Sequence, residues 1–371
     1  MQSLRLGTTG GAVVEVRRML ASLGLLDNTD PHSEVLFDGP TELAVRHFQQ
    51  RRAISVDGMV GPETFSALTG AQRRLGDRVL AHDSGQVLHG DDVSSLQQQL
   101  LELGYNLIRA DATFGPATAE ALRSFQRDYG LVADGICGPN TLRALRQLGR
   151  RVVGGSPQML RDLVAVAQSG PNLFGKRIVL DPGHGGIDPG TVHDGVTEAE
   201  LAWDLATRLE GRLTALGVGT WLTRGPGNGR TDEERAALAN EVSADLVLSL
   251  HVDGFTSPRA NGLATYYYGT DNSASNMGAR LADLVRRELV ARTGLTDGRS
   301  HGKAWSMLRL TKMPTVRLEL GYLSSPIDRP RLLDPLFRDT VAEGLLVAVQ
   351  RLYLPIADDP PTGVMRISAI A

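Results

Sequence analysis

The sequence predicts a multidomain chain: two small three-helix domains, followed by an α/β domain whose mixed or parallel sheet is flanked by helices. Two observations carry this prediction. A set of residues in the first part of the chain recurs about 77 positions later, which indicates a tandem repeat. From about residue 176 onward, short apolar runs alternate with amphipathic helical patterns, as in α/β folds.

Each copy of the repeat has the pattern helix, loop, helix, turn, helix, and we place the copies at residues 1–72 and 83–150. In the second copy, apolar residues from Val93 to Leu103 follow helical spacing and Gly104 is suited to end that helix. Pro139 is suited to begin the last one. The residues that recur at the offset of 77 are Phe37, Thr41, Phe48, Gln49, Asp57, Gly58, Gly61, Pro62 and Thr64.

Glycine, serine and proline punctuate the chain after the repeats. Residues 151–174 are expected to form a linker with a short helix over 157–168, because Ser156 can cap its first turn. The α/β domain is expected at residues 175–356. Residues 357–371, which contain a Pro-Pro-Thr sequence, are expected to form a flexible tail.

The α/β domain shows strands and helices in alternation. Because ligands bind at the carboxyl ends of strands in such sheets, polar residues at those ends are the candidates for function. The expected strands are 177–181, 218–223, 245–251, 262–268 and 315–320. The expected helices are 198–216, 231–243, 273–292 and 335–353.

Composition excludes several classes of protein. The 371 residues contain 39 Lys and Arg against 42 Asp and Glu, and the net charge of −3 argues against a nucleic-acid-binding protein. No apolar run reaches the roughly 18 residues of a membrane-spanning helix. With a single cysteine, Cys137, an internal disulfide framework and a cysteine-based zinc site are both excluded.

The first 20 residues lack the continuous apolar stretch of a secretory signal. As written, the sequence therefore predicts a cytoplasmic protein. If a leader has been removed from the chain, the expected location is extracellular or in the cell wall.

Histidine and glutamate side chains lie where the predicted strands end. His184 follows the first strand in a glycine-rich loop, His251 ends the third strand, Glu319 lies near the end of the last, and Glu198 opens the first long helix. Two histidines and one carboxylate leave an open position on zinc, which is the pattern of catalytic sites. A further carboxylate outside the ligand set can transfer the proton of an activated water.

The residues alone leave the role of Glu198 open. Thr197 and Glu200 fit a capping box, which would give Glu200 a structural task and leave Glu198 free to face the glycine-rich loop. Alternatively, both glutamates only interact favourably with the helix dipole.

The repeats resemble the type 1 peptidoglycan-binding domain family. The second copy carries FGPAT, SFQRDYGL and ADGICGPNT, and the first has FDGPT at the first of these positions. The resemblance implies three-helix modules that bind peptidoglycan. Most of the motif residues are core and turn residues, so they report the fold more than the ligand, and Cys137 is expected to be a buried, inert thiol.

Residues 175–354 closely resemble the zinc-dependent N-acetylmuramoyl-L-alanine amidases of the amidase-3 family. The resemblance lies in segments such as GKRIVLDPGHGGIDPG, TEAELAWDLATRLE, ADLVLSLHVD and TVRLELGYLSSP. It implies that His184, Glu198 and His251 bind Zn²⁺ and that Glu319 is the catalytic glutamate. It also implies hydrolysis of the amide between the lactyl group of N-acetylmuramic acid and L-Ala of the stem peptide.

Three positions depart from the pattern of that family. Arg317 stands where an aliphatic residue is usual, and on a strand it shares a face with Glu319. There it can lower the pKa of that glutamate, orient a substrate carboxylate, or form a solvent-side salt bridge, the interpretation we favour from sequence. Asp253, where Asn is common, can support the metal ligands from outside. Ser325 also replaces Asn.

Two functions follow from these observations. The first is a peptidoglycan or muropeptide amidase with tandem wall-binding modules. The alternative is a non-catalytic cytoplasmic regulator, in which the same fold binds an enzyme of peptidoglycan precursor synthesis. This alternative rests on the absent leader, on Arg317, and on the resemblance of the whole layout to an actinobacterial group in which such regulators are known.

Overall fold

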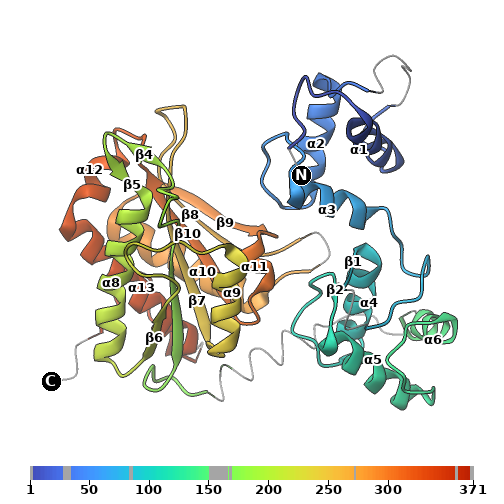
Figure 1. Cartoon of the computed structure of the whole chain (residues 1–371). Coiled ribbons are helices and arrows are strands. Elements are labelled where there is room, and N and C mark those ends of the chain that lie inside the picture. The colour runs from blue at the N-terminus through green and yellow to red at the C-terminus, as the bar shows by residue number, and fades with distance from the viewer. Residues whose placement is uncertain are drawn as a thin grey trace. The chain divides into compact units, whose positions relative to one another are not determined.

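The computed structural model describes residues 3–27, 35–82, 87–149, 166, 169–270, 273–355 and 358–367. The chain divides into two compact units, one made mainly of residues 1–160 and the other mainly of residues 161–371. Each unit is described by itself (Figure 1). The short helix expected over 157–168 lies outside the described residues, apart from Val166.

The N-terminal unit is helical, as the repeat predicts. Its two hydrophobic cores are separate, one for each copy, and the largest buried side chains include Phe48 and Phe125, which are equivalent in the two copies. A two-stranded ladder pairs Leu88 with Phe114 in the second copy. The elements are α1 (Gly11–Ser22), α2 (Gly39–Arg51), α3 (Pro62–Ala71), β1 (Leu88–His89), α4 (Asp91–Glu102), β2 (Thr113–Phe114), α5 (Pro116–Tyr129) and α6 (Pro139–Gly149).

The recurring motif residues hold the turn before the last helix of each copy. In the first copy, Nε2 of Gln49 donates to Oδ1 of Asp57 at 2.7 Å, and Oε1 of Gln49 accepts from the Gly58 amide at 2.9 Å. Gln126 makes the same two bonds to its own turn, at 2.8 Å each. These residues therefore build the fold, and their presence in a sequence reports the module and not its ligand.

The structure shows the role of the aspartate in the FDGPT segment, by which the first copy differs from the FGPAT of the second. Asp38 caps α2 by accepting from the Thr41 amide, and Arg17 donates to the same carboxylate at 2.8 Å. In the second copy, the position of Arg17 is taken by Gln97, which donates to Asp111 at 2.8 Å. An ion pair therefore replaces an amide–carboxylate hydrogen bond without changing the fold.

The C-terminal unit contains a six-stranded sheet with the order β6-β3-β7-β10-β8-β9. All neighbouring strands are parallel except β8 and β10, so the sheet is mixed. A separate two-stranded ladder joins β4 to β5. The elements are β3 (Arg177–Pro182), β4 (Val192–His193), β5 (Val196–Thr197), α8 (Glu198–Ala215), β6 (Gly219–Leu222), α9 (Asp232–Glu241), β7 (Leu246–Asp253), β8 (Leu263–Tyr268), α10 (Asn276–Thr293), β9 (Asp297–Lys303), α11 (Ser306–Leu310), β10 (Thr315–Tyr322), α12 (Asp328–Leu333) and α13 (Pro335–Tyr353).

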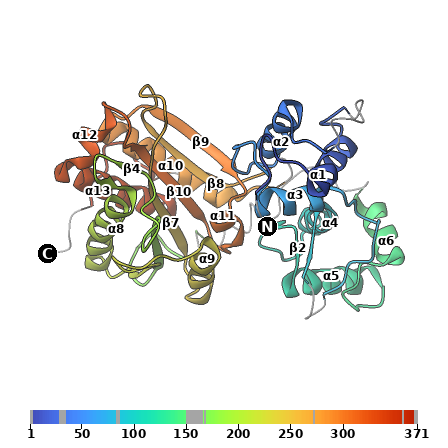
Figure 2. The same ribbon diagram turned by 45° about the horizontal axis from the view of Figure 1, so that its top comes forward.

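Helices cover both faces of the sheet (Figure 2). On one face, alternate strand residues such as Ile178 and Leu248 pack against α8, α10 and α13 in the largest hydrophobic cluster. On the other, Val179 and Val247 pack against α9 and α11. Because both faces are covered, the central strands read as continuous apolar runs, and this is why the sequence reveals them.

The structure adds elements that the sequence analysis did not predict. Strand β9 was not predicted because its sequence, DGRSHGK, lacks the alternation of apolar and polar residues that is typical of a strand. It lies at the edge of the sheet and is hydrogen-bonded to β8 alone. Helices α11 and α12 are too short for a periodic pattern. Among the described residues, no helix has the length and apolar character needed to cross a membrane.

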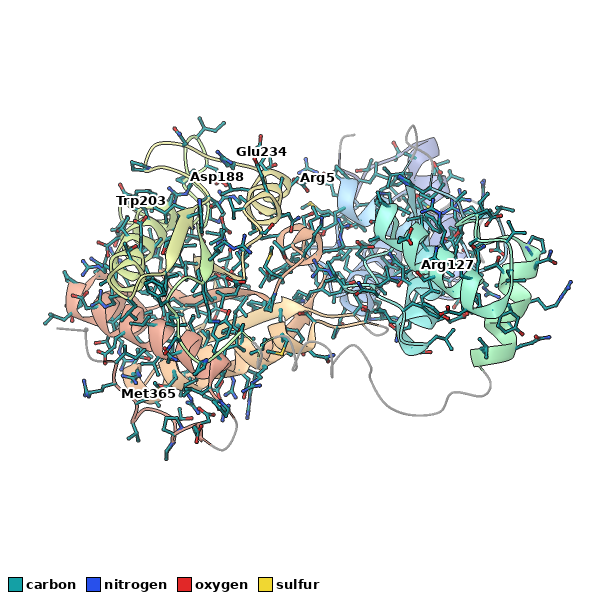
Figure 3. All side chains as sticks on the ribbon, turned by 90° about the horizontal axis from the view of Figure 1, so that it is seen from below. Arg5, Arg127, Asp188, Trp203, Glu234 and Met365 are labelled. Carbon is teal, nitrogen blue, oxygen red and sulfur yellow. The ribbon has the colours of Figure 1, made fainter. Side chains whose placement is uncertain are left out.

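The expectation of a flexible tail does not fit residues 358–367. Arg351, buried on α13, donates to both oxygens of Asp359, at 2.6 and 2.9 Å. The Gly363 amide donates to Glu288 of α10, and Arg292 donates to the Met365 carbonyl. The tail region around Met365 is visible in Figure 3 against the C-terminal unit. Buried charges on α10 and α13 hold this segment, which its Pro-rich sequence does not reveal.

Candidate metal centre and active site

The predicted site residues lie at the carboxyl edge of the sheet. His184 follows β3, His251 lies near the end of β7, and Glu319 lies near the end of β10. Glu319 and His251 are register partners on neighbouring parallel strands, so their side chains project to the same side of the sheet. The topology thus brings together residues that lie far apart in the sequence.

The glycine-rich loop after β3 allows close packing around the histidines. A Cβ atom on Gly183 would lie 2.2 Å from the His251 ring, and one on Gly190 would lie 2.6 Å from Oε2 of Glu198. His184 itself has a φ of 56°, in the left-handed region. The glycines of the Asp-Pro-Gly-His-Gly-Gly segment therefore allow the loop backbone to lie directly against the His251 ring.

The capping box predicted at the start of α8 is present. The Thr197 hydroxyl accepts from the Glu200 amide, and the Glu200 carboxylate accepts from the Thr197 amide. Glu198 is left to face the glycine-rich loop, where its Oε2 accepts from the Thr191 amide at 3.0 Å. Of the two alternatives left open by the sequence, the structure supports the one in which Glu198 belongs to the site.

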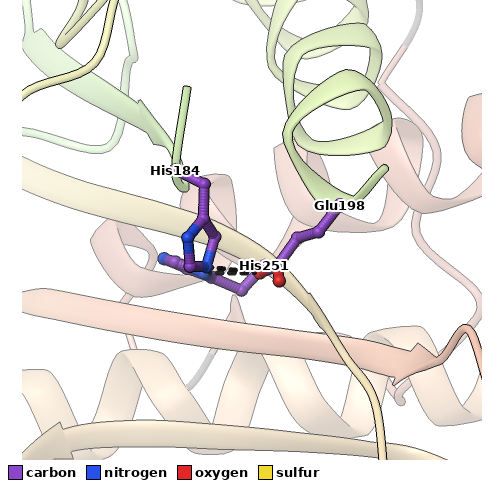
Figure 4. A group of neighbouring side chains, drawn as sticks. All are labelled: His184, Glu198 and His251. Carbon is purple, nitrogen blue, oxygen red and sulfur yellow. Dashed lines mark hydrogen bonds and ion pairs between the residues drawn. The ribbon is translucent and has the colours of Figure 1, made fainter. Parts of the chain in front are cut away.

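Three donor side chains converge at this point: His184, Glu198 and His251, whose potential ligand atoms all lie within 4.8 Å of one another (Figure 4). Oε1 of Glu198 lies 2.8 Å from Nδ1 of His251 and 3.2 Å from Nε2 of His184. The Glu198 and His251 side chains are buried. Two imidazole nitrogens and one carboxylate oxygen at these distances could together hold a metal ion.

The electrostatics favour the metal-binding forms of Glu198 and His251, whereas the hydrogen bond with Glu198 raises the pKa of His184 and favours its protonated form while no metal is bound. Burial raises the pKa of Glu198, but hydrogen bonds with both imidazoles together hold that pKa well below the usual range. Burial lowers the pKa of His251 to about 4. At neutral pH, Glu198 is therefore a carboxylate and His251 a neutral imidazole, as metal coordination needs.

A residue that the sequence analysis missed orients His184. Asp188, labelled in Figure 3, lies four positions after His184, and its Oδ2 is 2.7 Å from Nδ1 of the imidazole. This contact leaves Nε2 of His184 facing Glu198. A carboxylate that binds one ring nitrogen of a histidine fixes the nitrogen available to a metal, and the short His-to-Asp spacing could have signalled it.

A buried ion pair underlies the same loop. Nη1 of Arg235 donates to Oδ1 of Asp181 at 2.6 Å, and Nη2 of Arg235 donates to the His184 carbonyl at 2.6 Å. The other oxygen of Asp181 accepts from Ser249 at 2.6 Å. Asp181 thus connects β3, α9 and β7 behind the site, and Arg235 links this ion pair to the loop that carries His184.

Glu319 lies beside the metal-binding cluster, in an ion pair with Arg317. Nη2 of Arg317 is 2.6 Å from Oε1 of Glu319. The prediction that this pair would be on the solvent side is wrong, because the side chains are only 26% and 10% exposed. The alternative in which Arg317 lowers the pKa of Glu319 holds for the arginine's own effect, but it does not set the net direction. Burial outweighs the arginine and raises the pKa of Glu319 to about 7.

The remaining candidates have local contacts. Oδ1 of Asp253 accepts from the Gly254 amide at 2.7 Å, so Asp253 shapes its own turn; within the described residues it makes no hydrogen bond to His184, Glu198 or His251. Ser325 is buried at the start of α12 and accepts from the Asp328 amide. Two other histidines of the C-terminal unit, His193 and His301, lie outside the three-residue cluster.

Comparison with known families and proteins adds independent information. The family model described as N-acetylmuramoyl-L-alanine amidase matches residues 178–351. The model described as putative peptidoglycan binding domain matches residues 9–68 and 89–145, one match in each copy of the repeat.

Individual relatives include a protein similar over nearly the whole chain. N-acetylmuramoyl-L-alanine amidase CwlM of Mycobacterium tuberculosis is 49% identical over 373 residues, which cover 97% of this chain and 92% of that protein. N-acetylmuramoyl-L-alanine amidase LytC of Bacillus subtilis is 31% identical over 173 residues, 47% of this chain and 34% of LytC. A solved N-acetylmuramoyl-L-alanine amidase from Clostridium difficile 630 is 27% identical, with a TM-score of 0.45, over 47% of this chain and 94% of that structure.

Proposed function

This chain belongs to the N-acetylmuramoyl-L-alanine amidase family and carries two peptidoglycan-binding modules, and from that premise we propose that it is a zinc-dependent hydrolase of the lactyl–L-Ala amide in peptidoglycan or its fragments. The observation that carries the proposal is the convergence of His184, Glu198 and His251 at the carboxyl edge of the sheet, with Glu319 on the neighbouring strand.

His184, Glu198 and His251 are the residues that would hold the metal ion. Their donor atoms are two nitrogens and one oxygen, without thiolate, and this set suits zinc. When bound, zinc polarises a carbonyl as a Lewis acid and makes water acidic near neutral pH. Asp188 keeps the Nδ1 side of His184 engaged, so that Nε2 is presented to the metal.

Glu319 is the proposed proton carrier. A general base works best when its pKa lies near the operating pH, and burial raises the pKa of Glu319 to about 7. In this role the Glu319 carboxylate takes a proton from the attacking water and then delivers it to the nitrogen of the leaving L-Ala. The amide C–N bond breaks as that nitrogen is protonated, which releases the stem peptide as an amine and leaves a lactyl carboxylate.

The two helical modules would raise the local concentration of substrate at the hydrolase domain. Binding of one linked module converts the next encounter into an intramolecular one. We therefore expect the full chain to act faster on polymeric peptidoglycan than on small muropeptides of the same bond type.

The decisive experiment pairs zinc content with hydrolysis by the full chain. Wild type loaded with one zinc ion is expected to release stem peptide from muropeptides, whereas Glu319→Gln is expected to keep the zinc and lose the activity. His301→Gln is the matched control outside the cluster and should behave as wild type.

Intact muropeptides after incubation with the zinc-loaded wild type would contradict the hydrolase proposal. The non-catalytic alternative, a regulator that binds an enzyme of peptidoglycan precursor synthesis, would then take its place. That alternative is examined by isolating complexes formed by the full chain and by Glu319→Gln, which should bind such an enzyme equally well.

A further inference from the structure

Arg317 is bonded to one oxygen of Glu319 only. Both Nε and Nη2 of the guanidinium approach Oε1, at 2.8 and 2.6 Å. Within the part of the chain that the structure describes, Oε2 of Glu319 has no hydrogen-bond partner. The carboxylate is therefore held at one oxygen and free at the other.

An indole ring holds the guanidinium in turn. The Cζ atom of Arg317 lies 4.9 Å from the centroid of the Trp305 ring, within the range of a cation–π contact. The Tyr266 ring lies 4.7 Å from Trp305, and Tyr266 is the register partner of Arg317 on β8. The pairing of β10 with β8 and the contact with Trp305 thus hold the Arg317 side chain in place next to Glu319.

This arrangement distinguishes among the three roles considered for Arg317. A solvent-side salt bridge would leave both side chains largely exposed, whereas those of Arg317 and Glu319 are 26% and 10% exposed. Capture of a substrate carboxylate would need a free forked edge of the guanidinium, and the Nε–Nη2 edge is already engaged by Glu319. The contact that the structure shows therefore favours a role in which Arg317 acts through Glu319.

We propose that Arg317 is a positioning residue that, clamped by Trp305, holds Oε1 of Glu319 so that Oε2 is the oxygen that exchanges protons with water and the leaving amine. The proposal rests on the proposed hydrolase function. It assigns the two oxygens of one carboxylate to two tasks, anchoring and proton transfer. Lysine does not replace arginine in this role, since an ammonium group lacks the planar fork and stacks poorly on an indole ring.

The test compares Arg317→Met and Arg317→Lys with wild type in the zinc-loaded full chain. Misplacement of a catalytic group by about 1 Å can cost about 100-fold in rate, so kcat is expected to fall by about that factor with KM nearly unchanged. Arg317→Lys should recover only a small part of the loss. Added guanidinium ion should restore part of the kcat of Arg317→Met, which a purely structural role would not allow.

Arg287→Met is the matched control. Arg287 is also paired with a single acid, since it lies 2.9 Å from Asp283. It lies on α10, however, which packs on the face of the sheet opposite to that of Arg317 and Glu319. This variant should keep the wild-type kcat and KM. A Trp305→Leu variant should share the kcat defect of Arg317→Met, because it removes the clamp and leaves both charges in place.

Three outcomes would overturn the proposal: an unchanged kcat in Arg317→Met, a defect confined to KM, or a kcat loss that guanidinium does not relieve. Inactivity of the zinc-loaded wild type would instead overturn the proposed function. The positioning role is still decided in that case by crystal structures of wild type and Arg317→Met, in which the Glu319 carboxylate should adopt different orientations. The same orientation in both would contradict it.

Discussion

Oε1 of Glu198 lies 2.8 Å from Nδ1 of His251, although the two residues are 53 positions apart in the chain. The first residue of α8 thus meets the end of β7, and His184 completes the cluster from the loop after β3. The cluster joins three separate elements, so a metal ion bound there stabilises the folded state and has no equivalent site in the unfolded chain.

We therefore expect zinc to raise the thermal unfolding temperature of the full chain. A ligand at about 100 times its Kd adds about 2.7 kcal/mol to the free energy of unfolding. Calorimetry with zinc and with a chelator measures the difference. His251→Ala should abolish the zinc-dependent shift, and His301→Ala should keep it; equal shifts in the two variants would argue against the cluster as the binding site.

Gly183→Ala is expected to disrupt the site. The new Cβ would lie 2.2 Å from the His251 ring, closer than any real contact, so the imidazole must move. We expect zinc binding to be lost and the domain to be destabilised by about 1–3 kcal/mol, as in overpacked cores. Zinc titration and chemical unfolding report the two effects.

Gly211→Ala is the control for this change. Gly211 lies within α8, and a Cβ there meets no atom within 4 Å. Alanine should therefore stabilise the helix by about 0.5–1 kcal/mol and leave zinc binding unchanged. Normal zinc binding by Gly183→Ala would show that the loop tolerates a side chain at that position.

Arg235→Met is expected to be strongly destabilising. The Arg235 and Asp181 side chains are only 4% and 2% exposed, so the substitution leaves a buried carboxylate without its ionic partner. Breaking such a pair costs about 3–5 kcal/mol. Urea unfolding measures the loss, and zinc affinity should fall as well, because Arg235 also binds the His184 carbonyl.

The control for Arg235 is a surface ion pair. Arg212 donates to Asp339 at 2.9 Å, and the side chains are 34% and 40% exposed. Arg212→Met should cost no more than about 1 kcal/mol, because solvent screens exposed pairs. Similar losses for Arg235→Met and Arg212→Met would mean that burial of the Asp181 pair has little energetic effect.

Stability is expected to decrease in acid because of Asp181. Burial raises its pKa, but Arg235, Ser249 and Thr223 together outweigh burial and hold the pKa below the ordinary value. A carboxyl with a lowered folded-state pKa stabilises the protein above its unfolded pKa of about 3.9, and this contribution is lost as the pH falls through the folded-state value.

Urea unfolding between about pH 7 and pH 3, with chelator present so that metal release does not contribute, measures this effect. The free energy of unfolding should fall below about pH 4, and Asp181→Asn should show a shallower fall from a lower starting value. Identical pH slopes in wild type and Asp181→Asn would assign the acid sensitivity to other carboxyls.

The sequence by itself determined the repeat, the order of the main helices and strands, and the strand-end positions of His184 and His251, while it left the role of Glu198 open. These features can be predicted because each depends on a pattern of residues close together in the sequence. Turn motifs recur at a fixed offset, covered strands read as apolar runs, and histidines directly follow such runs. The capping box at Thr197 was also local, since all its atoms lie within one helical turn.

Only the tertiary structure decided how deeply Glu319 and Arg317 are buried. Their spacing on β10 predicts that they meet, but the depth of burial depends on Trp305 and on strands β7 and β8, which the sequence does not place. Burial raises the pKa of Glu319 to about 7, although the neighbouring Arg317 acts to lower it. The physical reason is that desolvation depends on everything packed around a group, whereas a residue pattern records only its neighbours along the chain.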